Sequence, residues 1–98
     1  MTVTQLTESE RADRLPALFA SGWKMVEGRD AITKTFQFAD FNAAFGFMSR
    51  VALKAEEKCH HPEWFNVWNR VEVTWSTHDA GGLSILDVEM AAWMDSTV

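Results

Sequence analysis

Apolar residues recur at two different periods along the chain, and these periods divide it into seven elements. Three segments have the three- and four-residue spacing of amphipathic helices, at residues 7–22, 40–60 and 84–94. Four shorter segments have the alternation of strands, at residues 23–27, 31–38, 64–68 and 71–77. The order α-β-β-α-β-β-α predicts an α+β fold, with a four-stranded antiparallel sheet and three helices on one face.

The middle helix has the clearest pattern. Asp40 is a good N-cap, and Pro62 should end the helix near Cys59 or His60, because it restricts the residue before it to extended backbone. The predicted apolar stripe of this helix consists of Phe41, Ala44, Phe45, Met48, Val51, Ala52 and Ala55.

The first helix carries a signal at each end and one conflict inside. Thr7 and Glu10 have the spacing of a capping box, and Gly22 is a plausible stop. Pro16 falls within the helical pattern. Because proline lacks an N–H and its ring crowds the preceding turn, we expect it to kink this helix or split it in two.

The turn between the last two strands decides which side chains reach the core. A three-residue loop over residues 68–70 pairs Val67 with Val71, whereas a two-residue turn at residues 69–70 pairs Trp68 with Val71. We predict the three-residue loop, because it gathers on one face the apolar set Phe65, Val67, Val71, Val73 and Trp75. The alternate side chains then face away from the helices: Glu72, Thr74 and Ser76.

Length and composition narrow the function classes. A chain of 98 residues predicts a single domain over residues 1–98. The net charge of −5 and the lack of any basic run argue against direct nucleic-acid binding. We expect no secretory signal and no membrane span, since no apolar run approaches ~20 residues. A single cysteine fits a reducing compartment, so we expect a cytoplasmic location. Twelve aromatic residues exceed what a small interior hides, which favours a homo-oligomer.

All three histidines lie where predicted elements end. His60 and His61 follow the middle helix, and His78 follows the last strand. Sites are commonly built at element ends, and an imidazole gives or takes a proton near neutral pH. Three such rings in one pocket would form an acid–base site. Surface positions or satisfied polar contacts explain the spacing equally well, so both interpretations stay open at this point.

Two carboxylates are candidates to orient these histidines. Asp87 lies three residues after Ser84, and this spacing also suits a capping box at the start of the last helix. Spacing alone favours that structural role. Glu56 is either a second partner for a histidine or an ordinary charge on the solvated face of the middle helix.

Other chemistry in this stretch has weaker support. Cys59, the histidines and Asp87 form a conceivable metal set, but adjacent histidines do not present two ligands from one helix face, and no Cys-x-x-Cys pair is present. We therefore expect no metal and no cofactor. Trp64 and Trp68 flank Asn66, where a flat heteroaromatic ligand could stack, although such tryptophans more often belong to a core or an interface.

One group of motifs is more specific than spacing. It consists of the run His60-His61-Pro62-Glu63-Trp64-Phe65-Asn66-Val67-Trp68-Asn69, of Val71-Glu72-Val73, Ser76-Thr77-His78 and Gly82-Leu83-Ser84, and of Asp87. From Glu56 to Asp87 the chain resembles the pterin-4a-carbinolamine dehydratases. A looser likeness includes Gly22-Trp23, Gly28-Arg29-Asp30, Asp40-Phe41-Asn42 and Phe45-Gly46-Phe47-Met48, so it covers nearly the whole chain.

The resemblance implies the same α+β fold, in dimers or tetramers built partly through the sheets. It also implies loss of water from 4a-hydroxytetrahydropterin to give quinonoid dihydropterin, without a metal or bound cofactor. That step recycles the tetrahydrobiopterin cofactor of aromatic amino acid hydroxylases. In animals the family includes a protein that stabilises dimers of a homeodomain transcription factor. A protein-binding transcriptional co-regulator on the same fold is therefore the alternative function.

The family's site residues map onto this chain one by one. Its active-site histidines match His60, His61 and His78, and its assisting carboxylates match Asp87 and Glu56. We expect His61 and His78 near the reacting centre, with one histidine acting as acid at the 4a-hydroxyl and another as base at N5. His60 is expected either to take part as an acid or base or to bind the pterin ring. The sequence leaves open which does which. Substrate contacts are expected from His60, His61, Trp64, Ser76, Thr77 and His78. Cys59 departs from the family, which often has a polar or acidic residue there.

Overall fold

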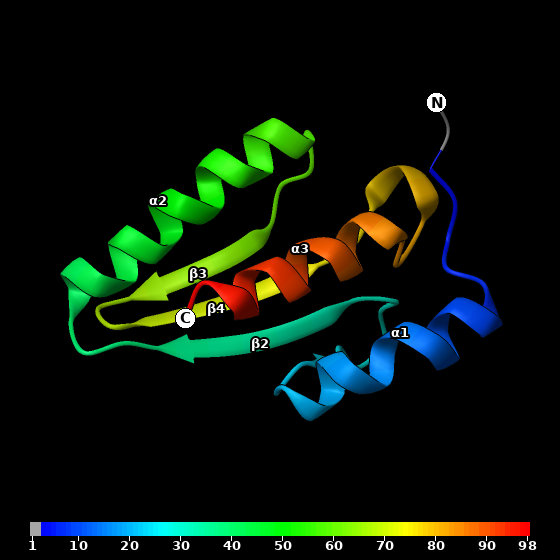
Figure 1. The fold of residues 1–98 in the computed structure, drawn as a ribbon, viewed down its shortest axis with the longest axis horizontal. Coiled ribbons are helices and arrows are strands. Elements are labelled where there is room, and N and C mark those ends of the chain that lie inside the picture. Colours follow the sequence, from blue (N-terminus) through cyan, green and yellow to red (C-terminus); the bar gives the residue numbers. More distant parts are fainter. Residues whose placement is uncertain (1–2) are drawn as a thin grey trace.

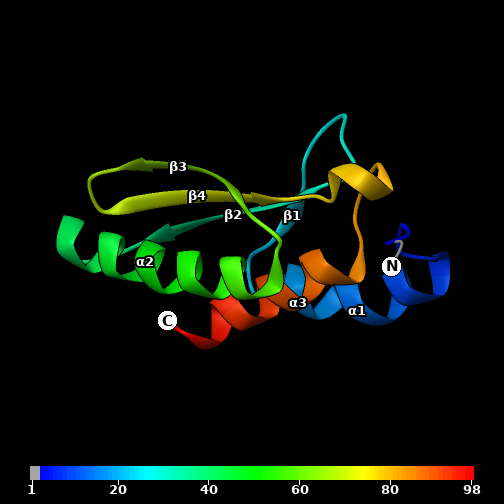
Figure 2. The same ribbon diagram turned by 90° about the horizontal axis from the view of Figure 1, so that it is seen from above.

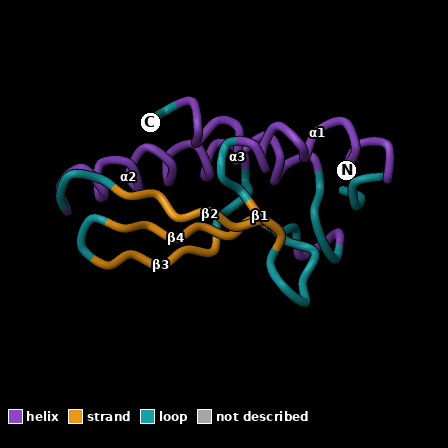
Figure 3. The backbone as a smooth tube through the Cα atoms, turned by 90° about the horizontal axis from the view of Figure 1, so that it is seen from below, coloured by secondary structure: helices purple, strands orange, loops and turns teal. Residues whose placement is uncertain are grey.

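The computed structural model describes residues 3–98 and confirms the predicted α+β fold and its order of elements (Figure 1). The helices are α1 (Glu8–Ala20), α2 (Phe41–Lys58) and α3 (Ile85–Ser96). The strands are β1 (Lys24–Met25), β2 (Ile32–Gln37), β3 (Glu63–Val67) and β4 (Arg70–Trp75), and a short 3-10 helix, η1 (His78–Ala80), follows β4. The sheet is antiparallel with strand order β1-β2-β4-β3, and the three helices form one layer against one of its faces (Figures 2 and 3).

Both predicted capping boxes are present. The Thr7 hydroxyl accepts from the Glu10 backbone, and the Glu10 carboxylate accepts from the Thr7 N–H at the start of α1. Asp40 caps α2 through a bond from the Ala43 N–H. Pro16 lies inside a single continuous α1, so of the two expected outcomes, a kink or a split, the split does not occur. Within residues 3–98, no helix is long and apolar enough to cross a bilayer.

The core lies between the sheet and the helices, and one lysine, Lys34, lies on the face of the sheet that packs against the helices. The Lys34 side chain lies over the Phe36 ring and brings its ammonium group to the edge of the core. There Nζ donates to the Asp95 carboxylate at 2.7 Å and to the Ser21 carbonyl at 2.6 Å. Because the charge is paired while the aliphatic stem packs, a lysine is compatible with this apolar face of β2.

The buried stripe of α2 differs from the predicted one. Ala44, Val51 and Ala55 are buried as expected, but the largest core side chain of the helix is Phe47, which packs against Phe36 and Phe38 of the adjoining sheet region. Two predicted members of the stripe, Phe41 and Phe45, are instead exposed, and so is Ala52. A helix with apolar residues on several sides offers more than one possible stripe, and only packing against the sheet selects one.

The predicted register of the β3–β4 hairpin is wrong. The turn consists of Trp68 and Asn69, with Val67 opposite Arg70, and Trp68 has a positive φ of 48°. The side-chain amide of Asn66 donates to the carbonyls of Trp68 and Arg70, which holds this turn in place. As a result Val71, Val73 and Trp75 face the core, while Phe65 and Val67 lie on the outer face of β3. Glu72 faces away from the helices as predicted.

Candidate active site

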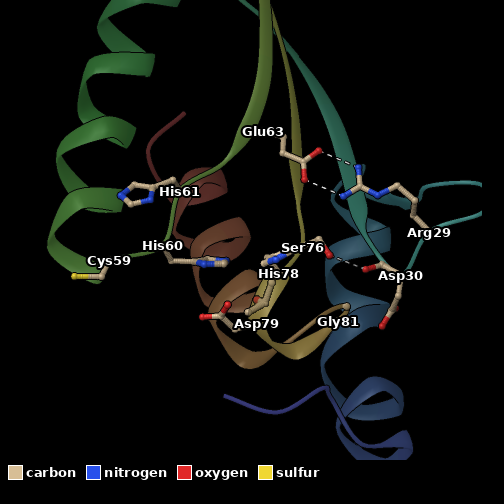
Figure 4. Close-up of a pocket in the computed structure, with 12 residues that line it drawn as sticks. Arg29, Asp30, Cys59, His60, His61, Glu63, Ser76, His78, Asp79 and Gly81 are labelled. Atoms are coloured by element: carbon tan, nitrogen blue, oxygen red, sulfur yellow. Dashed lines mark hydrogen bonds and ion pairs between the residues drawn. The ribbon is translucent and has the colours of Figure 1, made fainter. Parts of the chain in front are cut away.

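A cavity of about 590 Å³ lies where α2 ends, β4 ends and α3 begins (Figure 4). Segments far apart in sequence contribute to it: the β1–β2 turn, the connection from α2 to β3, the end of β4, and η1 with the glycines after it. All three histidines line this cavity. The complete lining consists of Arg29, Asp30, Cys59, His60, His61, Glu63, Ser76, Thr77, His78, Asp79, Gly81 and Gly82.

His60 is held in one orientation from two sides. Cys59 ends α2 in the left-handed conformation, which turns the chain so that His60 points back into the fold. The His60 ring stacks on Trp75 with centroids 5.1 Å apart, and its Nε2 lies 2.5 Å from Asp87 Oδ1. Because a carboxylate oxygen only accepts, His60 Nε2 is the donor in this bond and carries the proton.

Asp87 is fully buried and both of its oxygens are used. While Oδ1 accepts from His60, Oδ2 accepts from the Thr77 hydroxyl at 2.7 Å and from the Ser84 N–H at 2.9 Å. The Thr77 and Ser84 hydroxyls lie 2.6 Å apart. Asp87 therefore completes the capping box of α3 and orients His60 with the same side chain, so the two sequence interpretations of Asp87 are compatible.

His61 lies at the rim of the cavity. Its Nε2 is 3.1 Å from Glu56 Oε1, and both side chains are largely exposed. Figure 4 shows the His61 ring beside the end of α2, away from the rings of His60 and His78, which point toward one another across the cavity. The structure thus brings His60 and His78 together and leaves His61 with Glu56 at the entrance.

The His78 loop is fixed at both of its ends. Thr77 forms an isolated bridge with Gly82, and Gly81 closes η1 in the left-handed conformation. At Gly82, an added side chain would collide with the Asp30 carboxylate, so only glycine permits this approach. His78 is exposed on the first turn of η1 and its ring faces the cavity.

The remaining expected contacts divide into two groups. Ser76 and Thr77 line the cavity, but the Ser76 hydroxyl donates to the Asp30 carbonyl, and the Thr77 hydroxyl donates to Asp87. Trp64 is half-buried against the core and is absent from the cavity lining of the described chain. The hairpin register is the reason, because it turns Trp64 toward the helices.

Two ion pairs that the sequence reasoning missed complete the cavity wall. Arg29 forms a bidentate pair with Glu63 at 2.9 and 2.8 Å, and Arg11 forms one with Asp30 at 2.8 and 2.7 Å. The hydrogen bonds from the two arginines hold the pKa values of Glu63 and Asp30 below their usual ranges. The charged turn at residues 28–30 was the available signal, but only the sheet order brings it to the start of β3.

Cys59 completes the lining without joining the hydrogen-bond network of the histidines. Its thiol contacts the Glu56 carbonyl and is exposed. Among residues 3–98, no three His, Cys, Asp or Glu side chains are grouped so that they could hold a metal ion. In geometry the site is therefore a polar cavity with two facing imidazoles, one of them fixed by a buried carboxylate.

Comparison with known proteins agrees with this geometry. The family model described as pterin 4 alpha carbinolamine dehydratase matches residues 4–97. The chain is 57% identical over 95 residues to the pterin-4-alpha-carbinolamine dehydratase of Drosophila melanogaster. That match covers 97% of this chain, which spans about half (50%) of the fly protein. It is 55% identical over 94 residues to a putative pterin-4-alpha-carbinolamine dehydratase of Paraburkholderia xenovorans, covering 96% of each.

One solved structure supports both fold and family. The crystal structure of a transcriptional coactivator/pterin dehydratase from Brucella melitensis matches with a TM-score of 0.88 and 53% identity, over 95% of this chain and 97% of that chain. The family match covers almost every residue, including the whole cavity lining. The chain therefore belongs to the pterin-4-alpha-carbinolamine dehydratase family, whose members are hydro-lyases.

Proposed function

We propose that this chain removes water from 4a-hydroxytetrahydropterin to give quinonoid dihydropterin, in the recycling of tetrahydrobiopterin. The observation that carries the proposal is the single cavity lined by all three imidazoles, in which His60 is held by the buried Asp87 behind the wall. Family membership supplies the class of substrate. The reaction needs no redox change, and acid–base side chains are sufficient to supply its chemistry.

The reaction requires one proton donor and one proton acceptor. The 4a-hydroxyl leaves as water once it receives a proton, and the N5 proton is lost as the double bond between N5 and C4a forms. One positioned acid or base contributes typically ~10²- to 10⁴-fold. We assign these transfers to His61 and His78, because both rings are exposed and each can exchange its proton with water between turnovers. Glu56 orients His61 through its 3.1 Å contact.

His60 has a different task in this proposal. Its ring is buried, stacked and bonded to Asp87, so it keeps one orientation and one tautomer. It presents Nδ1 to the cavity as a hydrogen-bond acceptor, which suits a ring N–H of the pterin. Ser76 and Thr77 complete the substrate contacts mainly through their backbone, since their hydroxyls are engaged elsewhere. Trp64 acts only through the packing of β3 behind the site.

The test is the rate at which 4a-hydroxytetrahydropterin absorbance is lost. We expect His61→Ala and His78→Ala to lower this rate by about 10²-fold each, the lower end of the range for one acid or base. Glu56→Gln should lower it less, because it removes only the orientation of His61. Glu57→Gln is the matched control, since Glu57 lies on the same turn of α2 and pairs with Lys54 instead of a histidine. Equal rates in the wild type and both histidine variants would refute the proposal.

A second function is a protein-binding transcriptional co-regulator on the same fold. Its specific support is the exposed apolar face of α2, at Phe41, Phe45 and Leu53, together with the coactivator name of the Brucella structure. Homodimers or homotetramers would cover the same kind of surface. Phe65 of the edge strand β3 and Trp68 of the turn after it add further exposed apolar area. Light scattering measures the oligomeric state. A pull-down that recovers no partner from a fully active preparation would contradict the co-regulator function.

A further inference from the structure

The pair Arg29–Glu63 crosses the outer side of the sheet at the cavity mouth. Arg29 comes from the β1–β2 turn and Glu63 from the first residue of β3, so the pair connects the two edges of the sheet past the end of β4 (Figure 4). Both contacts between guanidinium and carboxylate are short, at 2.9 and 2.8 Å. The side chains are 47% and 56% exposed, so the pair contributes little to folding. Its position on the cavity wall, by contrast, puts it within reach of a ligand in the cavity.

The cavity has an excess of acidic groups. Arg29 is the one Arg or Lys among its lining residues in the described chain, and Glu63 occupies its guanidinium. Asp30 is in turn neutralised by Arg11, which leaves the exposed Asp79 and the buried Asp87 as further carboxylates at or behind the wall. The hydrogen bonds from Arg29 keep the pKa of Glu63 below its usual range, so Glu63 is a carboxylate at neutral pH.

These charges affect which side chain a bound pterin can carry. A planar guanidinium binds phosphate or carboxylate through two parallel bonds, and a free arginine at the mouth would accept an anionic side chain. We propose that Glu63 is a specificity-determining residue that occupies Arg29 and so restricts the site to pterins with uncharged side chains. The inference rests on the proposed function and deepens it, since it names which pterins are accepted.

The experiment measures binding of two ligands that differ in one phosphate, dihydroneopterin and dihydroneopterin phosphate, by calorimetry at low salt. The wild type should prefer the uncharged ligand. Glu63→Gln frees Arg29, which should strengthen binding of the phosphate. The dissociation constant for dihydroneopterin phosphate, divided by that for dihydroneopterin, should therefore fall by at least about threefold, which is the order expected for one exposed ion pair. The double variant Glu63→Gln/Arg29→Gln should restore the ratio toward that of the wild type. Added salt should reduce these differences.

Glu89→Gln is the matched control, because it removes the same charge from an exposed position of α3 outside the cavity. An equal ratio in the wild type and Glu63→Gln, or an equal change in Glu63→Gln and Glu89→Gln, would overturn the assignment. Equal affinity of the wild type for both ligands would do the same. If the wild type binds neither dihydropterin, the proposed function fails and this inference with it, whereas an unaltered ratio with normal dihydroneopterin binding refutes this inference alone.

Discussion

Replacement of Asp87 by asparagine tests how one side chain serves both the fold and the site. The Ser84 N–H points at Oδ2 and cannot turn around, because Ser84 is the N-cap of α3 and its backbone is fixed there. The amide oxygen of asparagine must therefore take the Oδ2 position, and its NH₂ group must face His60 Nε2. Since an NH₂ group only donates, His60 has to move its proton from Nε2 to Nδ1 to keep the bond.

The cost in stability follows from the three bonds that Asp87 accepts. Each hydrogen bond to a charged group contributes about 1.5–3 kcal/mol, against about 0.5–1.5 kcal/mol for a neutral one. If each donor–acceptor pair survives in neutral form, each of the three bonds loses about 1–1.5 kcal/mol, so Asp87→Asn should lower the free energy of unfolding by about 3–4.5 kcal/mol. A domain of this size is typically stable by about 5–15 kcal/mol. The expected loss is smaller than this total, so the variant should stay folded and its activity can be measured.

The cost in activity follows from the tautomer. With the proton on Nδ1, His60 offers the cavity an N–H where the wild type offers a lone pair. A lost hydrogen bond of this kind costs about 1–3 kcal/mol, so the rate should fall by roughly 10- to 100-fold. Urea unfolding measures the stability, the loss of 4a-hydroxypterin absorbance measures the rate, and the nitrogen chemical shifts of the His60 ring identify the tautomer. Asp13→Asn is the matched control, because Asp13 is exposed on α1 outside the cavity and its change should cost less than about 0.5 kcal/mol. An unaltered His60 tautomer in Asp87→Asn, with wild-type activity, would refute the reasoning.

Two further predictions concern the frame of the site. Gly82→Ala should destabilise the protein by about 1–3 kcal/mol in urea unfolding, because its methyl group meets the Asp30 carboxylate. Gly46→Ala in α2, where the added carbon has only an ordinary contact with a flexible side chain, should instead be neutral or stabilising by up to about 1 kcal/mol, and equal losses in both variants would contradict this explanation. The lowered pKa of Asp30, caused mainly by the hydrogen bond from Arg11, means that the pair stabilises the fold above about pH 4 and is lost as pH falls below it. The free energy of unfolding, measured from pH 6 to pH 2.5, should therefore drop more steeply in the wild type than in Asp30→Asn, and parallel curves would argue against the pair.

Local sequence signals located most of the elements in this protein. The capping boxes at Thr7 and Ser84 mark helix starts through hydrogen bonds between residues three apart, so nothing distant is needed to recognise them. Pro62 marks the end of α2, at Lys58, through another local effect, because a proline restricts the backbone of the residue before it. The three histidines and Asp87 were singled out from their types and positions, and the resemblance to a family gave them their expected roles.

The failures have a common physical origin. The hairpin register was predicted by assuming that all its apolar side chains share the core face, but β3 is an edge strand whose Phe65 and Val67 lie outside. In α2 the predicted stripe includes Phe41 and Phe45, which are exposed, and omits Phe47, which is buried. The apolar residues of that helix permit more than one stripe. In each case the choice depends on which surface the element packs against, and this surface belongs to other parts of the chain.

Residue types and short spacings thus determined the order of elements, the helix caps and the set of histidines. Only the tertiary structure decided that His60 and His78 face each other, that His61 stays at the rim, and that Trp64 packs in the fold instead of the cavity. It also decided that Arg29 meets Glu63 across 34 positions of sequence. Local signals act through bonds within one turn of chain, whereas these arrangements depend on the strand order β1-β2-β4-β3. That order brings the β1–β2 turn, the start of β3 and the end of α2 together in the wall of the cavity.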